Sequence, residues 1–155
     1  ERFDGHHEDL WMTEHVARHP AEMMYAVLCM IMGGVLERFP ALRVAFLEAN
    51  CSWVPYYLWR MDEQFEVRGK QAREHLSMRP SEYFRRSCYV SIEADEEVAA
   101  DAIERIGDNI VFSTDFPHPD CAFPQATDTF LSQPFSDEAK RHILWDNPRR
   151  MYRFD

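Results

Sequence analysis

Val111-Phe-Ser-Thr-Asp-Phe-Pro-His-Pro-Asp120 is the stretch of sequence that says most about the fold. It includes the end of a short, apolar, β-biased segment, residues 109–114, which predicts a strand. The strand runs directly into Asp115, and Pro117 and Pro119 stiffen the loop that follows. An acidic side chain at the end of an apolar strand is typical of parallel α/β sheets, in which reactive groups gather at the carboxyl ends of the strands.

Two further segments repeat this strand pattern, and helical segments separate them. Residues 43–48 predict a strand that is buried on both faces, and residues 88–92 predict another. Apolar residues recur at helical spacing between the strands. We therefore expect helices at residues 20–39, 54–65, 80–84, 95–106, 125–131, 137–144 and 147–152. Strands that alternate with helices indicate parallel strands joined by crossover helices, and hence an α/β fold.

The number of strands limits what the chain can form. About three strands are predicted, and three strands cannot close a barrel. The chain is either a small open α/β domain or part of a larger fold whose other strands lie upstream, and its start at Glu1 without a methionine favours a piece of something longer. Residues 1–19 are polar and predict a loop or a loose first helix. His6 and His7 are adjacent, so on a strand they would face opposite ways rather than share a metal ion.

Composition and charge exclude several classes of protein. The chain has 155 residues, the size of one domain, and 46% of them are apolar, which is enough to bury a core. The formal net charge of -10 argues against nucleic acids and anionic membranes as partners, because both require a basic face. No apolar run approaches the roughly 18–20 residues of a membrane span. An acidic balance is common in enzymes and names no partner by itself.

The cysteines indicate the compartment. Cys29, Cys51, Cys88 and Cys121 include no pair in C-x-x-C spacing, which argues against a structural zinc site. Three of them lie in or beside apolar runs, where a reduced and buried thiol is the usual state. We therefore expect a reducing, cytoplasmic environment.

Acidic residues end all three predicted strands: Glu48, Glu93 and Asp115. A carboxylate is costly to bury unless it is paired, protonated or bound to a metal, so this pattern predicts a functional site. Asp115 can bind a divalent ion or take a proton from metal-bound water, and His118 can orient it or contact substrate. The structural alternative is that Asp115 caps a turn while His118 is solvated. Glu93 is the weakest member, because it could lie in the first turn of its helix.

The residues that follow Glu48 would rim the same pocket. Asn50 and Trp53 are the candidate substrate contacts, and the indole could form a wall for an apolar or aromatic substrate. Trp53 could equally pack under the next helix. His19 precedes Pro20 and is expected to start a helix, with a place at the mouth of the site as the alternative.

Four segments in order along the chain resemble the amidohydrolase-related family, which includes metal-dependent decarboxylases such as aminocarboxymuconate-semialdehyde decarboxylase, as well as hydrolases. The resemblance covers residues 20–154. The segments are Phe39-Pro-Ala-Leu-Arg-Val-Ala-Phe-Leu-Glu-Ala-Asn-Cys-Ser-Trp-Val-Pro55, Arg60-Met-Asp-Glu63, Phe112-Ser-Thr-Asp-Phe-Pro-His118 and Asn147-Pro-Arg-Arg-Met151.

The resemblance implies a (β/α)8 TIM-type barrel, of which this chain holds strands six to eight with their helices in one partial domain, residues 1–155. Asp115 matches the strand-eight aspartate of the family, a metal ligand and proton-transfer group. Glu48 stands where many members have a strand-six histidine, which is a departure from the family pattern. The family's His-x-His pair on strand one and its histidine on strand five have no counterpart here.

The resemblance therefore implies the C-terminal part of a metal-dependent hydrolase or carboxy-lyase that acts on a small, carboxylated or aromatic substrate. Its divalent ion is expected to be zinc, with manganese or iron as alternatives, held by Asp115 and Glu48. The competing interpretation is a non-catalytic truncated homologue or assembly module, which forms a homo-oligomer or pairs with the missing barrel half through exposed strand edges. A third is a small α/β enzyme with Glu48 and Asp115 as an acid–base pair.

Overall fold

The computed structural model describes residues 11–119 and 121–154, and within them it contains a three-stranded sheet of order β1-β2-β3. The strands are β1 (Val44–Phe46), β2 (Cys88–Ile92) and β3 (Ile110–Phe112). Both pairings are parallel, with Val44 beside Cys88 and Ile92 beside Phe112. All three predicted strands and their parallel order are therefore confirmed.

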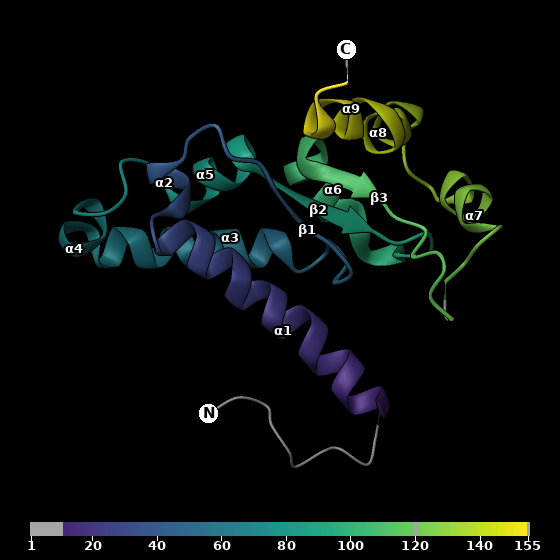
Figure 1. Cartoon of the computed structure of the whole chain (residues 1–155), viewed down its shortest axis with the longest axis horizontal. Coiled ribbons are helices and arrows are strands. Elements are labelled where there is room, and N and C mark those ends of the chain that lie inside the picture. The colour runs from purple at the N-terminus through teal and green to yellow at the C-terminus, as the bar shows by residue number, and fades with distance from the viewer. Residues whose placement is uncertain (1–10, 120, 155) are drawn as a thin grey trace.

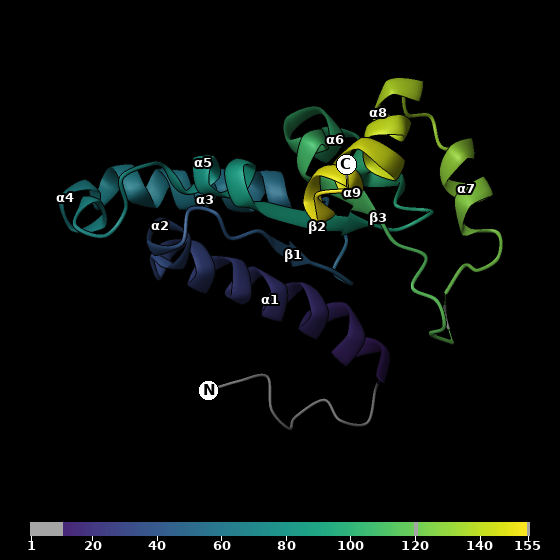
Figure 2. The ribbon, with the colours of Figure 1, turned by 45° about the horizontal axis from the view of Figure 1, so that its top comes forward.

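Helices separate the strands and surround them (Figure 1). Short 3-10 turns lie at Glu97–Ala99 and Gly107–Asn109, and a π-helical turn lies at His142–Asp146. The α-helices are α1 (Trp11–Met32), α2 (Val35–Arg38), α3 (Val54–Val67), α4 (Gly69–Arg73), α5 (Pro80–Ser87), α6 (Ala100–Ile106), α7 (Ala126–Ser132), α8 (Asp137–Arg141) and α9 (Asn147–Tyr152). Helix α1 runs beside β1, whereas α8 and α9 lie by β3 (Figures 1 and 2).

The first helix begins earlier than the sequence predicts. Helix α1 starts at Trp11 and contains Pro20, so of the two alternatives for residues 1–19, a loop or a first helix, residues 11–19 form the helix. An internal proline removes one backbone hydrogen bond, and this long helix tolerates that loss. Residues 1–10, with His6 and His7, lie outside the described part of the chain.

The glycine pair Gly33-Gly34 ends α1 rather than packing within one longer helix. The Gly34 N–H donates to the Ile31 carbonyl at 2.9 Å, and Gly34 has φ 71°, a left-handed conformation that glycine adopts without a steric penalty. The region predicted as one helix, residues 20–39, is therefore divided between two helices, α1 and α2.

The core is centred on β2, whose five residues are all buried. Val90, Ile92 and Ile110 are fully buried, and Phe84 of α5 and Leu58 of α3 join the same cluster. The expectation that β1 is buried on both faces is wrong, because Ala45 is exposed and Leu47 is 40% exposed. In the described residues β1 pairs with β2 alone, so its outer edge is open.

Candidate active site

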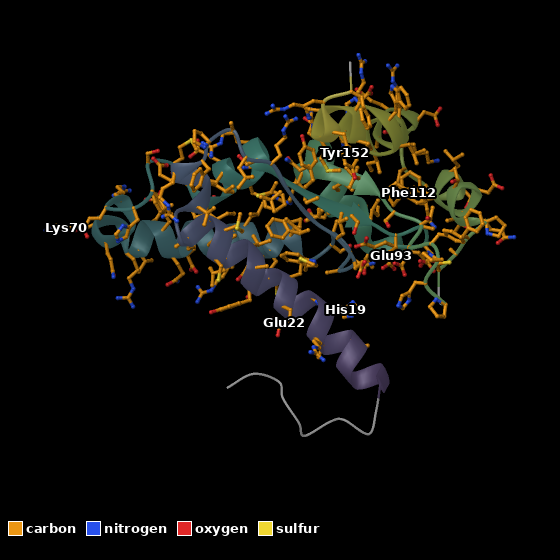
Figure 3. The ribbon with its side chains drawn as sticks, in the orientation of Figure 1. His19, Glu22, Lys70, Glu93, Phe112 and Tyr152 are labelled. Carbon is orange, nitrogen blue, oxygen red and sulfur yellow. The ribbon has the colours of Figure 1, made fainter. Side chains whose placement is uncertain are left out.

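A cavity of about 220 Å³ lies where the three strands end, and the acidic residues predicted at those ends line it together. Segments that follow each strand contribute to its wall, together with one histidine from α1. Figure 3 shows that histidine, His19, on α1 and Glu93 beyond the end of β2. The charged and histidine side chains of the lining are His19, Glu48, Glu93, Asp95, Asp115 and His118.

The loop after β1 is fixed in an unusual backbone conformation. Glu48 has φ 66° and Asn50 has φ 57°, both in the left-handed region that non-glycine residues seldom occupy. The backbone N–H of Glu48 donates to Ser91 Oγ at 3.0 Å, and the Glu48 carbonyl accepts from His19 Nδ1 at 3.3 Å. Contacts from β2 and α1 thus hold the strand end at which Glu48 lies.

A buried carboxylate, Glu96, ties the loop after β1 to the loop after β2. Its side chain is part of a residue only 7% exposed, and it accepts from the backbone N–H groups of Cys51 at 2.9 Å and Ser52 at 2.8 Å. The Ser52 hydroxyl donates to the same carboxylate at 2.5 Å. Both N–H groups lie in the loop just before α3, so Glu96 fixes the chain where it enters that helix. Burial, together with the adjacent Glu96 charge, raises the pKa of the Cys51 thiol.

Glu93, the weakest of the three acidic candidates in the sequence, lines the cavity together with the other two. Burial raises the pKa of its carboxyl group, and the negative charges of Glu96, Asp95 and Asp115 raise it further. A hydrogen bond from the Asn50 side chain acts against this rise in pKa. The cavity therefore concentrates negative charge in a half-buried place, which favours a bound proton or a cation there.

Asp115 and His118 lie together at the end of β3. Asp115 has φ 59°, and its N–H donates to Ser113 Oγ at 3.3 Å. The His118 N–H donates to the Asp115 carbonyl at 2.8 Å, which closes a turn. This turn leaves His118 Nδ1 3.7 Å from Asp115 Oδ2, close enough for the charge of one to influence the other.

The two candidate substrate contacts occupy different places. Asn50 bonds to Glu93, which lines the cavity. Trp53 is not in the cavity lining; its Nε1 donates to the carbonyls of Ala49 at 2.8 Å and Asn50 at 3.1 Å, and its ring packs against Tyr57 with centroids 5.7 Å apart. In this structure Trp53 supports the loop from within.

The side chains of the cavity fit a divalent metal ion as part of its ligand set. Carboxylate oxygens suit hard ions such as Mn²⁺, and the half-buried negative charge around Glu93 would be relieved by a cation. Within residues 11–119 and 121–154, no three His, Cys, Asp or Glu side chains are arranged to hold a metal ion. Asp115 and Glu48 would therefore need ligands from outside these residues.

Sequence reasoning missed Glu96, which lies among several acidic residues of the segment after β2. Its partner Cys51 is 45 residues away, so no local spacing identifies it as the buried one. No helix in the described part of the chain has both the length and the apolar character needed to cross a membrane.

The sequence of the chain is similar to a known protein family and to a known enzyme. The family model described as Amidohydrolase matches residues 9–154. The 2-amino-3-carboxymuconate-6-semialdehyde decarboxylase of Dictyostelium discoideum is 28% identical over 129 residues, which cover 83% of this chain and 36% of that protein.

Solved structures show the same fold. An amidohydrolase from Mycobacterium avium subsp. paratuberculosis K-10 matches with a TM-score of 0.76 and 20% identity over 92% of this chain and 36% of its own. A dihydroxybenzoic acid decarboxylase from Polaromonas sp. JS666, with bound manganese and the inhibitor 2-nitroresorcinol, matches with a TM-score of 0.67 and 24% identity over 84% of this chain and 39% of its own. The chain thus spans 36–39% of the length of these relatives. The three strands and their helices are part of a TIM-type barrel, as expected, and the chain belongs to the amidohydrolase family.

Proposed function

We propose that this chain forms one wall of the active site of a metal-dependent decarboxylase whose substrate is a small carboxylated aromatic or conjugated compound. The observation that carries the proposal is that Glu48, Glu93, Asp115 and His118 all line one cavity at the carboxyl ends of the strands. Decarboxylation is favoured over hydrolysis because two of the relatives described above are decarboxylases.

Asp115 would hold the metal ion, and Glu48 would occupy a second ligand position or bond to a ligand or water. A divalent ion bound there would polarise the substrate and lower the pKa of bound water. Their carboxylate oxygens suit manganese better than zinc, the ion expected from the family resemblance. The manganese of the dihydroxybenzoic acid decarboxylase supports this choice.

Decarboxylation breaks a carbon–carbon bond, releases CO₂ and requires a proton on the carbon that the carboxylate leaves. We assign this proton to Asp115, because Asp115 lines the cavity and its Oδ2 lies 3.7 Å from Nδ1 of the exposed His118 side chain. His118 would exchange the proton with solvent and keep the Asp115 carboxyl in position. Asn50 would hold Glu93, and Trp53 would keep the loop that carries both Glu48 and Asn50 in place.

The test is CO₂ release in the presence of Mn²⁺, measured on a complete barrel in which the strands that supply the remaining metal ligands accompany this chain. The inhibitor 2-nitroresorcinol carries its nitro group between two hydroxyls, which makes 2,6-dihydroxybenzoate a first substrate to assay, with 2-amino-3-carboxymuconate 6-semialdehyde as the second. We expect Asp115→Asn to lower the rate by about 10²–10⁴-fold. Asp128→Asn, on the exposed side of α7 and away from the cavity, is the matched control and should leave the rate unchanged. Equal rates in the two variants, a rate that persists in chelator, or no CO₂ from either substrate would each reject the proposal.

The open edge of β1 supports a second candidate function, an assembly module that pairs with a second copy or with another barrel segment. Unpaired strand edges and exposed apolar side chains such as Leu47 favour association. Sedimentation analysis tests this candidate, since a chain that remains monomeric at about 10–100 μM would rule out a self-associating module of ordinary affinity.

A further inference from the structure

A second and larger cavity lies at the amino-terminal ends of the strands, opposite the candidate active site. Its volume is about 830 Å³, and its lining includes residues just before each strand: Arg43 before β1, Arg86 before β2 and Asn109 before β3. Helices α6, α8 and α9, which gather beside β3 in Figure 1, complete the wall. No lining residue is shared with the candidate active site. We call this cavity the arginine groove.

The net charge of the groove is positive, whereas the net charge of the whole protein is negative. Six of the 17 basic lysine and arginine residues line it, with three carboxylates, although the chain carries a net charge of -10. Such a local excess of positive charge attracts anions to this face while the remaining surface repels them. The arginines are Arg43, Arg85, Arg86, Arg105, Arg150 and Arg153, and the carboxylates are Glu104, Asp108 and Glu138.

Three of these arginines are held in place by hydrogen bonds to uncharged oxygens, although the charge of Arg86 also interacts with the Glu37 carboxylate. Arg86 donates to Ser87 Oγ at 3.0 Å and to the Leu36 carbonyl. Arg150 donates to the Asp108 carbonyl and to Tyr89 Oη at 3.3 Å. Carbonyl and hydroxyl oxygens accept these hydrogen bonds but carry no net charge, so the guanidinium groups stay positive while their positions are fixed.

Arg43 and Arg105 of the groove also have bonded side chains. Arg43 donates to the backbone carbonyl of Arg150, so it too keeps its charge. Arg105 differs, because its Nε pairs with Asp101 Oδ1 at 2.7 Å, and this partner raises the pKa of Arg105.

A purely structural role does not account for the whole cluster. The bonds of Arg43, Arg86 and Arg150 fasten the segments before the strands to α9 and α2, which explains those three side chains. Among residues 11–119 and 121–154, Arg85 and Arg153 make no side-chain hydrogen bond or ion pair, yet both line the groove. The groove thus combines two exposed guanidinium groups, which make no bond within the described residues, with three fixed ones. This arrangement suits the binding of an anion better than a purely structural role.

We propose that the arginine groove binds a small oxyanion of high charge, with phosphate groups as the ligand chemistry. The planar guanidinium fork matches phosphate oxygens in pairs, and several forks around one cavity favour a ligand with two or more phosphate groups. The volume of about 830 Å³ accommodates such a ligand. A nucleic acid fits less well, because its length would bring it against the acidic remainder of the surface.

The experiment is calorimetric titration of the whole chain with sodium pyrophosphate at fixed ionic strength and without divalent cations. The double variant Arg85→Gln/Arg153→Gln removes the two groove arginines that make no bond within the protein. The matched control Arg68→Gln/Arg73→Gln removes the same charge from the end of α3 and from α4, outside the groove. We expect one saturable site per chain, about tenfold or more weaker in the groove variant and changed by less than about twofold in the control.

Equal weakening in both variants would mean that the ion only screens general charge, and the absence of saturable binding in the unaltered chain would likewise overturn the proposal. Unchanged melting temperatures show that both variants fold. A parallel titration with ADP identifies the source of the phosphate groups. Affinity equal to that of pyrophosphate indicates that only phosphates are recognised, whereas tighter binding indicates contacts to the nucleoside.

Discussion

The two ends of the same three strands differ in charge, size and backbone conformation. The carboxyl ends enclose a cavity of about 220 Å³ lined by acidic side chains, and three residues around it, Glu48, Asn50 and Asp115, have positive φ. The amino ends open into the arginine groove of about 830 Å³. Among the described residues that line this groove, positive φ occurs at Arg153 alone. Backbone strain is thus concentrated where we place the chemistry, and strain of this kind is typical of functional sites.

The distance between the two ends allows them to act independently. Strand β2 has five residues, which corresponds to roughly 17 Å at about 3.3 Å per residue. This exceeds the Debye length of about 8–10 Å at physiological salt, so exposed charges at one end are largely screened from the other. The buried sheet separates an acidic site from a basic one, and each can be altered without the other.

The largest effect is expected from removal of the carboxylate that organises the acidic end. Glu96→Ala leaves two backbone N–H groups and one hydroxyl without their acceptor, which should lower the free energy of unfolding by about 2–4 kcal/mol. Urea denaturation measures this loss. Glu97→Ala, its exposed neighbour, is the control and should change stability by less than about 0.5 kcal/mol. Equal losses in both variants would show that the Glu96 contacts do not secure the loop.

A cross-comparison of ligands tests whether the two ends are independent. Asp115→Asn should leave pyrophosphate affinity within about twofold, and Arg85→Gln/Arg153→Gln should leave Mn²⁺ affinity within the same limit, because of screening over the length of β2. Each change should weaken binding at its own end by about tenfold, or about 1.4 kcal/mol. Calorimetry with each ligand provides the four values. A tenfold change in ligand affinity at one end of the sheet, caused by a substitution at the other end, would contradict their independence.

A smaller effect should reveal the strain at Glu48. Glu48→Gly and Glu48→Ala both remove the carboxylate, but only glycine adopts φ 66° without a steric penalty. Glu48→Gly should therefore be more stable than Glu48→Ala by about 1 kcal/mol, as measured by urea denaturation. Identical stabilities would mean that the loop relaxes and that no strain is held there.

The smallest effect concerns the proton on Glu93. Its pKa is raised in the folded chain, so the folded state binds this proton more readily than the unfolded state, and stability falls as pH rises above the ordinary value of 4.5. Glu93→Gln removes this penalty and should raise the melting temperature at pH 7 by about 1–3 °C. The difference between variant and parent should vanish as the pH falls below 4.5. A variant that melts at the same temperature as its parent at pH 7 would contradict the raised pKa.

Local patterns predicted the strands and the acidic strand ends well. Strand β2 matches its predicted range because its apolar run is buried on both faces. The convergence of Glu48 and Asp115 follows from one rule, that the carboxyl ends of neighbouring parallel strands share an edge. The left-handed conformations of these two residues were beyond sequence reasoning, because non-glycine residues seldom adopt them and no glycine marks either position.

Features that depend on distant contacts escaped prediction. Pro20 resembled a helix start, although the preceding turns of α1 continue through it. Glu96 became identifiable only through partners 44 and 45 residues away. The arginines of the groove range from Arg43 to Arg153, and no local spacing in the sequence brings them together.

The most direct test of the central claim is Mn²⁺ titration of the chain, followed by the electron paramagnetic resonance signal of the free ion. With the Asp115 and Glu48 carboxylates as the proposed ligands, and no three-ligand group among the described residues, we expect weak binding, with a dissociation constant of about 1 mM. Asp115→Asn should weaken it by about tenfold, while Asp128→Asn leaves it unchanged. Equal Mn²⁺ binding by the two variants would contradict the placement of the metal at the carboxyl ends of the strands.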